Sequence, residues 1–214
     1  MEKRKLLNGF YNYTVILTYL GFLLGLLGIT FALQQNYRMC MIMLMCAGIC
    51  DMFDGAVAST RERSRQEKNF GIQIDSLSDL VCFGILPAIF VYRMGEGTAV
   101  AMICGGLYAL CALIRLAYFN VCEEERQHSE DGARKYYTGL PVTAAALTWP
   151  LLFILGAYIT AIPMTWALPG LALVMAVAFV LGFKLKKPRL AGKLVLVAIG
   201  VSLLIVTVLG DGMC

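Results

Sequence analysis

The sequence predicts an all-α integral membrane protein, built as a bundle of about six or seven transmembrane helices. Of its 214 residues, 59% are hydrophobic and 15% are charged, whereas soluble domains average about 45–50% apolar and about 25% charged residues. Since every backbone polar group inside a bilayer must be satisfied internally, we expect helices and no open strands. Seven stretches approach the roughly 20 residues that a helix needs to cross a bilayer: 14–34, 39–58, 74–93, 98–121, 140–161, 165–183 and 192–209.

The N-terminal residues 1–13 form a basic segment ahead of the first span. We expect residues 3–12 to be a short interfacial helix, with Lys3, Arg4 and Lys5 near lipid headgroups. The first span has no small-residue cleavage site, so we interpret it as a retained helix. We expect residues 14–214 to constitute one transmembrane domain, which would also carry any catalytic site.

The positions of Lys and Arg predict the orientation of the chain. If the N-terminus is cytoplasmic, fifteen of the eighteen Lys and Arg residues lie on that side. Only Arg38 and Arg93 lie outside, and Arg115 lies within a span. This asymmetry agrees with the positive-inside rule. We therefore expect a multi-pass protein of the cell membrane with a cytoplasmic N-terminus, membrane lipids around it and no nucleic-acid partner.

Four of the six Asp residues fall between positions 51 and 79, at the ends of two apolar segments. On helices, Asp51 and Asp54 share one face, and so do Asp75 and Asp79. The predicted topology brings all four to a similar depth near the cytoplasmic surface. A charged group beside hydrocarbon is costly, so this arrangement favours a functional site.

Oxygen ligands without His or Cys select Mg²⁺, Mn²⁺ or Ca²⁺. Two divalent ions would balance four carboxylates and could hold a phosphoryl group in transfer. Asp79, the deepest along its helix, is the candidate for accepting a proton from a hydroxyl. The alternative is an ion-coupled transporter, but the sequence shows no internal repeat, and the acids lie at a membrane edge.

The pattern D-x2-D-G-x2-A followed by G-x3-D-x3-D resembles the signature of the CDP-alcohol phosphatidyltransferase family. It departs from that signature at Ser59, where the family usually has Arg, and in a gap about three residues longer that contains Arg61, Arg63 and Arg65. The matching positions are Asp51, Asp54, Gly55, Ala58, Gly71, Asp75 and Asp79.

Three further segments resemble bacterial phosphatidylserine synthases: IDSLSDLVCFGILPA (74–88), RLAYFNV (115–121) and YYTGLPVTAAA (136–146). The resemblance implies a core of six helices, a homodimer, and two Mg²⁺ or Mn²⁺ ions at the cytoplasmic interface. It implies that L-serine attacks CDP-diacylglycerol and that CMP leaves, with glycerol 3-phosphate or inositol as the alternative acceptors.

The same resemblance assigns roles to individual residues. Asp51, Asp54 and Asp75 would hold metal, and Asp79 would contact the second ion and act as the base. For the serine carboxylate, the guanidinium of Arg115 is the candidate partner, with Asn120 and Lys135 as further alcohol-binding residues. The residues expected at the CDP-lipid are Gly55, Ala58, Ser59, Arg61 and Gly71, with one of the loop arginines replacing the usual guanidinium.

Overall fold

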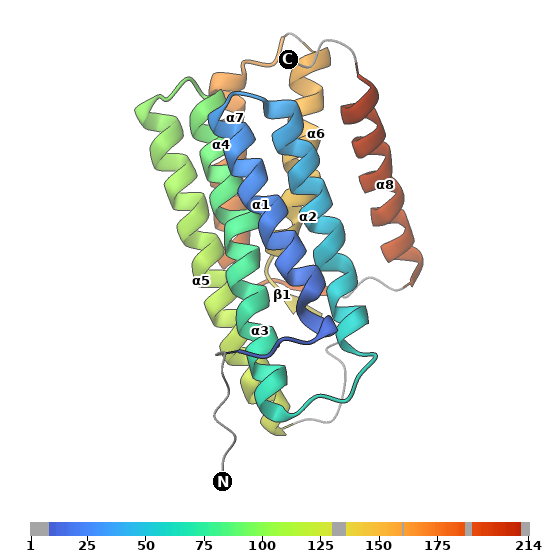
Figure 1. Ribbon diagram of the computed structural model, residues 1–214. Coiled ribbons are helices and arrows are strands. Elements are labelled where there is room, and N and C mark those ends of the chain that lie inside the picture. Colours follow the sequence, from blue (N-terminus) through green and yellow to red (C-terminus); the bar gives the residue numbers. More distant parts are fainter. Residues whose placement is uncertain (1–8, 130–135, 160, 187–189, 211–214) are drawn as a thin grey trace.

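The computed structural model describes residues 9–129, 136–159, 161–186 and 190–210, and its helices lie side by side in one bundle (Figure 1). A short 3-10 turn, η1 (Tyr13–Val15), leads into the first helix, and a second, η3 (Val142–Ala144), leads into α6. The helices are α1 (Ile16–Leu33), α2 (Tyr37–Ala58), α3 (Arg65–Asp79), α4 (Leu86–Met94), α5 (Ala99–Ser129), α6 (Ala145–Tyr158), α7 (Met164–Val180) and α8 (Leu190–Leu209).

Each of the seven predicted spans contains helix, and α3 and α4 together form one of them. Within the described residues, four helical spans are long and apolar enough to cross a membrane: Tyr13–Leu33, Tyr37–Ala58, Arg65–Met94 and Ala99–Glu125. Three apolar helices are shorter: Val142–Tyr158, Met164–Val180 and Val195–Leu209. The all-α membrane fold expected from the composition is therefore confirmed.

Several boundaries differ from the predicted ones. The third span starts at Arg65 and not near residue 74, because Ser64 caps the helix and its side chain and that of Glu67 form a reciprocal capping box. The fourth extends to Ser129 as a polar continuation of the apolar helix. The predicted helix over 3–12 is not helical at residues 9–12, and its other residues lie outside the described ranges.

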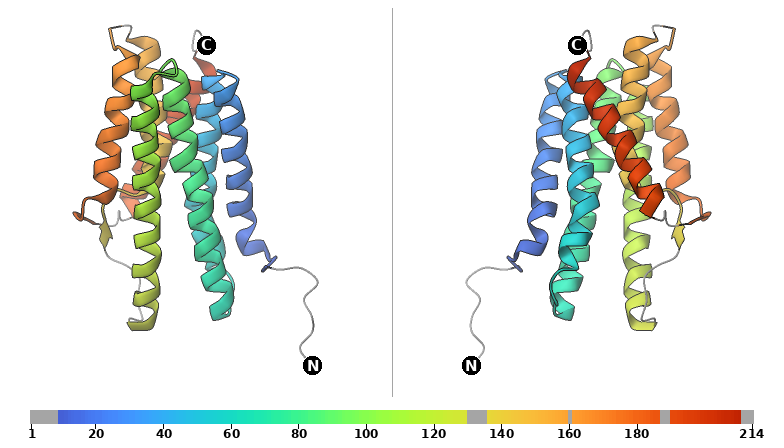
Figure 2. Two further views of the ribbon diagram at one scale, coloured as in Figure 1. Left: turned by 90° about the vertical axis from the view of Figure 1, so that its left-hand side faces the viewer. Right: turned by 90° about the vertical axis from the view of Figure 1, so that its right-hand side faces the viewer.

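Successive spans alternate in direction, so one end of the bundle collects the start of α1, the end of α2 and the start of α3 (Figures 1 and 2). We call this the motif end, and the end holding Leu33, Tyr37, Met94 and Ala99 the far end. A two-stranded antiparallel ribbon pairs β1 (Tyr136–Thr138) with β2 (Lys184–Lys186). It joins the segment before α6 to the segment after α7.

The core contains large, fully buried aromatic side chains from α4, α5 and α6. Phe90 meets Trp149 edge to face at 6.1 Å between ring centroids, and Tyr108 meets Trp149 at 5.5 Å. Such edge-on pairs stabilise a core beyond their buried area. They hold the helices of the middle of the chain together above the motif end.

Between α3 and α4 the helix widens into a π-helical turn, η2 (Leu80–Ile85), directly after Asp79. Pro87 follows this turn and has no N–H with which to bond the carbonyl four residues earlier, that of Phe83. The Tyr108 hydroxyl donates a hydrogen bond to that carbonyl at 2.6 Å, and Trp149 Nε1 donates to the Tyr108 hydroxyl at 3.3 Å. Turns of this kind are frequent at functional sites.

Candidate functional site

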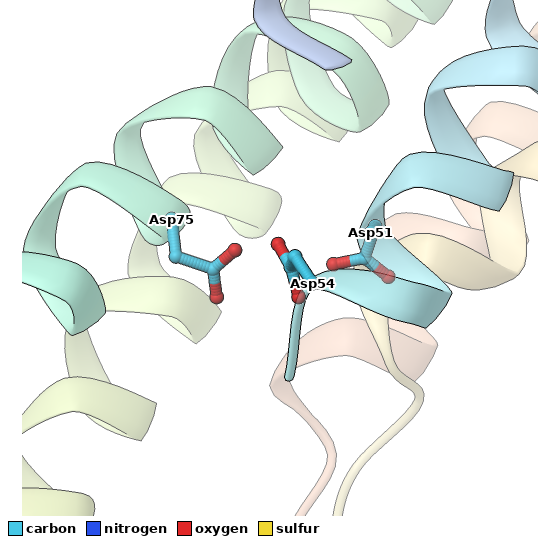
Figure 3. Close-up of side chains that lie close together, drawn as sticks. All are labelled: Asp51, Asp54 and Asp75. Carbon is cyan, nitrogen blue, oxygen red and sulfur yellow. The ribbon is translucent and has the colours of Figure 1, made fainter. Parts of the chain in front are cut away.

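Three carboxylates from two helices meet at the motif end. Asp51 and Asp54 come from the last turns of α2, Asp75 comes from α3, and ligand oxygens of all three lie within 4.8 Å of one another. Figure 3 shows Asp54 between Asp75 and Asp51, with the side chains directed toward one another across the gap between the helices. The two halves of the sequence pattern are therefore brought together.

The fourth carboxylate, Asp79, joins the same cluster. Its side chain interacts with that of Asp51, and Asp75 interacts with Asp54, so each pair links α2 to α3. All four side chains are only partly exposed. Gathering four like charges is unfavourable unless cations or protons compensate them. The carboxylates of α2 thus lie in contact with those of α3, and the four form one cluster.

The donor set fits a hard divalent cation. It consists of carboxylate oxygens that converge from two helices, which is the ligand type that Mg²⁺, Mn²⁺ and Ca²⁺ prefer. The hydroxyl of Thr18 on α1 adds a hydrogen bond to Asp54, with 3.2 Å between Oγ1 and Oδ2. The arrangement could therefore hold cations beside a phosphate-bearing substrate.

The loop between α2 and α3 is anchored at the start of α3. Glu67 pairs with Arg61 at 3.6 Å and accepts a hydrogen bond from Asn12 Nδ2 at 3.2 Å. The ring of Phe10 packs on that of Phe70 with 5.5 Å between centroids. The segment ahead of α1 is thus attached to the start of α3, the helix that carries the second half of the motif.

The residues that we expect to contact the CDP-lipid lie on both sides of this loop. A Cβ added to Gly55 would meet nothing within 4 Å, so that backbone is open to approach. A Cβ added to Gly71 would lie 3.2 Å from Nη1 of Arg63. The Ser59 hydroxyl is turned back onto the Ala56 carbonyl at 2.7 Å. Ala58, the last residue of α2, is partly exposed.

The position of Arg63 is information that the sequence did not supply. By sequence alone Arg61, Arg63 and Arg65 are all candidates for the missing guanidinium, and Arg61 is the one expected among the CDP-lipid residues. In the structure Arg61 faces Glu67, whereas Arg63 lies against Gly71, one helical turn before Asp75. Spacing alone cannot reveal this difference, because the loop between the helices has no fixed period.

The predicted alcohol-binding residues lie in two different places. Arg115 is buried; its Nε donates to the Leu140 carbonyl at 2.8 Å, and its guanidinium carbon lies 5.5 Å from the centre of the Phe119 ring. Asn120 faces α3 instead, accepting from the Ser76 hydroxyl at 2.7 Å. Lys135 lies outside the described residues.

Arg115 also lines a cavity of about 310 Å³. Its walls come from α5 and from the end of α7 and the residues after it, including Phe119, Phe179 and Leu181. No lining residue of this cavity belongs to α2 or α3. The structure therefore places Asn120 beside the helix that carries Asp75 and Asp79, and Arg115 in a neighbouring cavity.

The sequence model of the CDP-alcohol phosphatidyltransferase family matches residues 11–206. The match covers nearly the whole chain, including the four carboxylates, and the chain belongs to this family. The resemblance inferred from the aspartate pattern is thereby confirmed.

Relatives of known name narrow the comparison. The chain is 31% identical over 160 residues to an archaetidylserine synthase from Methanothermobacter thermautotrophicus, covering 74% of this chain and 64% of that protein. It is 34% identical over 139 residues to the CDP-diacylglycerol–serine O-phosphatidyltransferase of Saccharomyces cerevisiae, covering 64% and 47%. The enzyme of that name from Bacillus subtilis is 27% identical over 149 residues, covering 68% and 82%. The aligned part thus spans less than two thirds of the archaeal and yeast proteins.

Proposed function

We propose that this protein transfers a phosphatidyl group from CDP-diacylglycerol to L-serine, forming phosphatidylserine and releasing CMP. The observation that carries the proposal is the cluster of Asp51, Asp54, Asp75 and Asp79 across α2 and α3. The names of the serine-using relatives support the choice of acceptor. The transporter alternative has no comparable support, since the chain is a member of a transferase family.

In this proposal Asp51, Asp54 and Asp75 hold divalent metal, and Asp79 contacts a second ion. Two Mg²⁺ or Mn²⁺ ions are the proposed occupants, and when bound they supply positive charge that stabilises the phosphates and the leaving group. Asp79 accepts the proton of the serine hydroxyl. The serine oxygen forms a bond to the phosphatidyl phosphorus, while the bond from that phosphorus to the oxygen of CMP breaks and CMP departs with the electron pair.

The CDP-lipid would lie along the glycines that flank the carboxylates. Gly55 leaves its backbone accessible, and Gly71 allows the guanidinium of Arg63 to approach the helix. Since Ser59 offers no guanidinium, we assign the contact with the CDP phosphates to Arg63, and Arg61 is the second candidate. A guanidinium can bind two phosphate oxygens at once, which a hydroxyl cannot do.

Serine would be recognised by residues of α5. Asn120 is positioned by Ser76, next to Asp75 on α3, and is therefore close to the motif. Arg115 supplies a buried positive charge at the wall of the neighbouring cavity, which suits a carboxylate. Lys135 is the third proposed contact.

We further place the protein in the cell membrane with the motif end on the cytoplasmic side, as a homodimer. This placement is supported by the sequence, in which fifteen of the eighteen Lys and Arg residues fall in segments that the predicted topology puts on the cytoplasmic side. At this interface a lipid substrate from the bilayer and a soluble alcohol can reach the same carboxylates. Chemical cross-linking in native membranes tests the dimer.

The test of the reaction is an acceptor panel. Purified protein is incubated with CDP-diacylglycerol, Mn²⁺ or Mg²⁺, and serine, glycerol 3-phosphate or inositol, and CMP release is measured. We expect release with serine alone, and none after chelation of the metal. Release that requires a different alcohol would contradict the serine assignment while retaining the transferase class. Ion flux in proteoliposomes without CMP release would contradict the class itself.

A further inference from the structure

Thr18 on α1 is bonded to both halves of the carboxylate motif. Its side-chain Oγ1 donates to Oδ2 of Asp54 on α2 at 3.2 Å. Its backbone carbonyl accepts from the Ser78 hydroxyl on α3 at 3.3 Å, immediately beside Asp79 in the sequence. Thr18 and Ser78 are both buried, with 7% of their surface exposed. A single residue outside the motif therefore connects the two helices that carry it.

The height of Thr18 along the bundle is set by close packing of α1. One turn further on, the Gly21 carbonyl accepts from the thiol of Cys82 at 3.3 Å. A Cβ added to Gly25 would lie 2.6 Å from the Cys82 sulfur and 3.3 Å from its Cα. Since α1 can approach the π-helical turn this closely only at glycine, its register against α3 is fixed. The Thr18 hydroxyl is thus held at the level of the carboxylates.

Asp54 is the central carboxylate of the cluster (Figure 3). It lies between Asp51 and Asp75 (Figure 3), so it has a like charge on either side. A hydroxyl carries one proton to donate, and a donor at one carboxylate oxygen restricts rotation of the group. The other oxygen then stays directed toward the space shared with the neighbouring carboxylates.

We propose that Thr18 is a positioning residue that orients the Asp54 carboxylate for a divalent cation. This inference rests on the proposed metal-dependent function. Hydrogen-bond partners that orient metal ligands commonly contribute about 10–100-fold to metal affinity. Thr18 lies in the first apolar span, 36 residues before Asp54 in the sequence, and only the fold connects it to the site.

The test compares variants that keep or remove the hydroxyl. Thr18→Val preserves the branched shape and removes the donor, Thr18→Ser keeps the donor, and Thr18→Ala removes both donor and branch. Thr207→Val is the matched control, because Thr207 is fully buried in α8 and its hydroxyl donates to the Leu203 carbonyl at 2.8 Å. Mn²⁺ binding to purified, metal-free protein is titrated by electron paramagnetic resonance, and thermal unfolding is followed in parallel.

We expect Thr18→Val and Thr18→Ala to weaken Mn²⁺ binding by about 10–100-fold. Thr18→Ser should stay within about threefold of the unaltered protein, and Thr207→Val should bind Mn²⁺ as the unaltered protein does. If Thr18→Val unfolds, the comparison of Thr18→Ser with Thr18→Ala decides. Equal affinities in all variants, or equal losses in Thr18→Ser and Thr18→Ala, would overturn the proposal.

The outcome is separable from the reaction itself. Mn²⁺ binding that depends on the Thr18 hydroxyl, together with no CMP release in the presence of serine, would contradict the proposed acceptor and support the positioning role. Absence of Mn²⁺ binding by the unaltered protein at millimolar concentrations would contradict the positioning role directly. In the Asp54→Asn background, Thr18→Val should cause no further loss, because the carboxylate that it orients is gone.

Discussion

The two ends of the bundle differ in how their charged side chains are surrounded. At the far end, Arg93 Nη2 donates to the Leu33 carbonyl at the end of α1 at 3.0 Å, and Arg38 Nε donates to the Thr207 carbonyl near the end of α8 at 2.8 Å. Arg38 also donates to the Val208 carbonyl. Each cation thus meets the negative end of a helix dipole, where positive charge is stabilising.

At the motif end, side chains of the same charge lie close together. Asp51, Asp54, Asp75 and Asp79 converge from two helices, and their side chains interact chiefly with one another and with Thr18. At the far end helix carbonyls stabilise the arginine charges, whereas the four clustered carboxylates of the motif end need cations or protons to offset their mutual repulsion. Arg38 and Arg93, the two arginines expected outside, are both bound to helix carbonyls.

The largest effect is expected for Asp79→Asn. In the proposed reaction the amide cannot accept the proton of the serine hydroxyl, and loss of a general base typically costs about 10²–10⁴-fold in rate. Steady-state CMP release measures kcat, and binding of radiolabelled CDP-diacylglycerol measures substrate affinity, which should persist. A variant that retains near-normal kcat would remove the base assignment.

The next effect separates two arginines of the same loop. Arg63→Gln should raise the KM for CDP-diacylglycerol by about 10-fold or more, since a hydrogen bond to a charged group contributes about 1.5–3 kcal/mol. Arg61→Gln is the matched control and should change KM less, because Arg61 is an exposed partner of Glu67. The reverse order of the two KM values would return the phosphate contact to Arg61.

A smaller effect is expected within the core above the motif. Tyr108→Phe leaves the Phe83 carbonyl and the Trp149 Nε1 without their present partner, which should lower stability by about 1–3 kcal/mol. Thermal unfolding in detergent measures the loss. Tyr158→Phe is the control, since Tyr158 is 60% exposed and should leave the unfolding temperature unchanged. Equal unfolding temperatures for the two variants would show that the hydroxyl does not support the π-helical turn.

The smallest effect concerns the far end. Arg38→Gln should lower the unfolding temperature slightly, because a charge at a helix terminus contributes about 0.3–1 kcal/mol when exposed and up to about 2 when partly buried. The kcat for CMP release should not change, as the helix carbonyls that it binds are remote from the motif end. A large loss of kcat without a change in stability would contradict the division of the molecule into two independent ends.

The sequence predicts correctly those features that depend on residues close together in the chain. Asp51 with Asp54, and Asp75 with Asp79, share helix faces because the helical period fixes spacings of three and four residues. Their assembly into one cluster followed from the alternation of spans. The start of the third span was predicted too late because hydropathy does not register the polar turn that Ser64 and Glu67 cap.

The sequence by itself determined the class of fold, the family and the identity of the clustered carboxylates. Only the tertiary structure decided that Thr18 contacts Asp54 and that Arg63 and not Arg61 lies against Gly71. It also decided that Arg115 bonds to the Leu140 carbonyl, whereas Asn120 bonds to Ser76 on α3. A helix in lipid is apolar on all sides, so its sequence does not reveal which face meets a neighbour. Those contacts depend on the register between helices, which close packing at Gly21 and Gly25 and the π-helical turn after Asp79 establish.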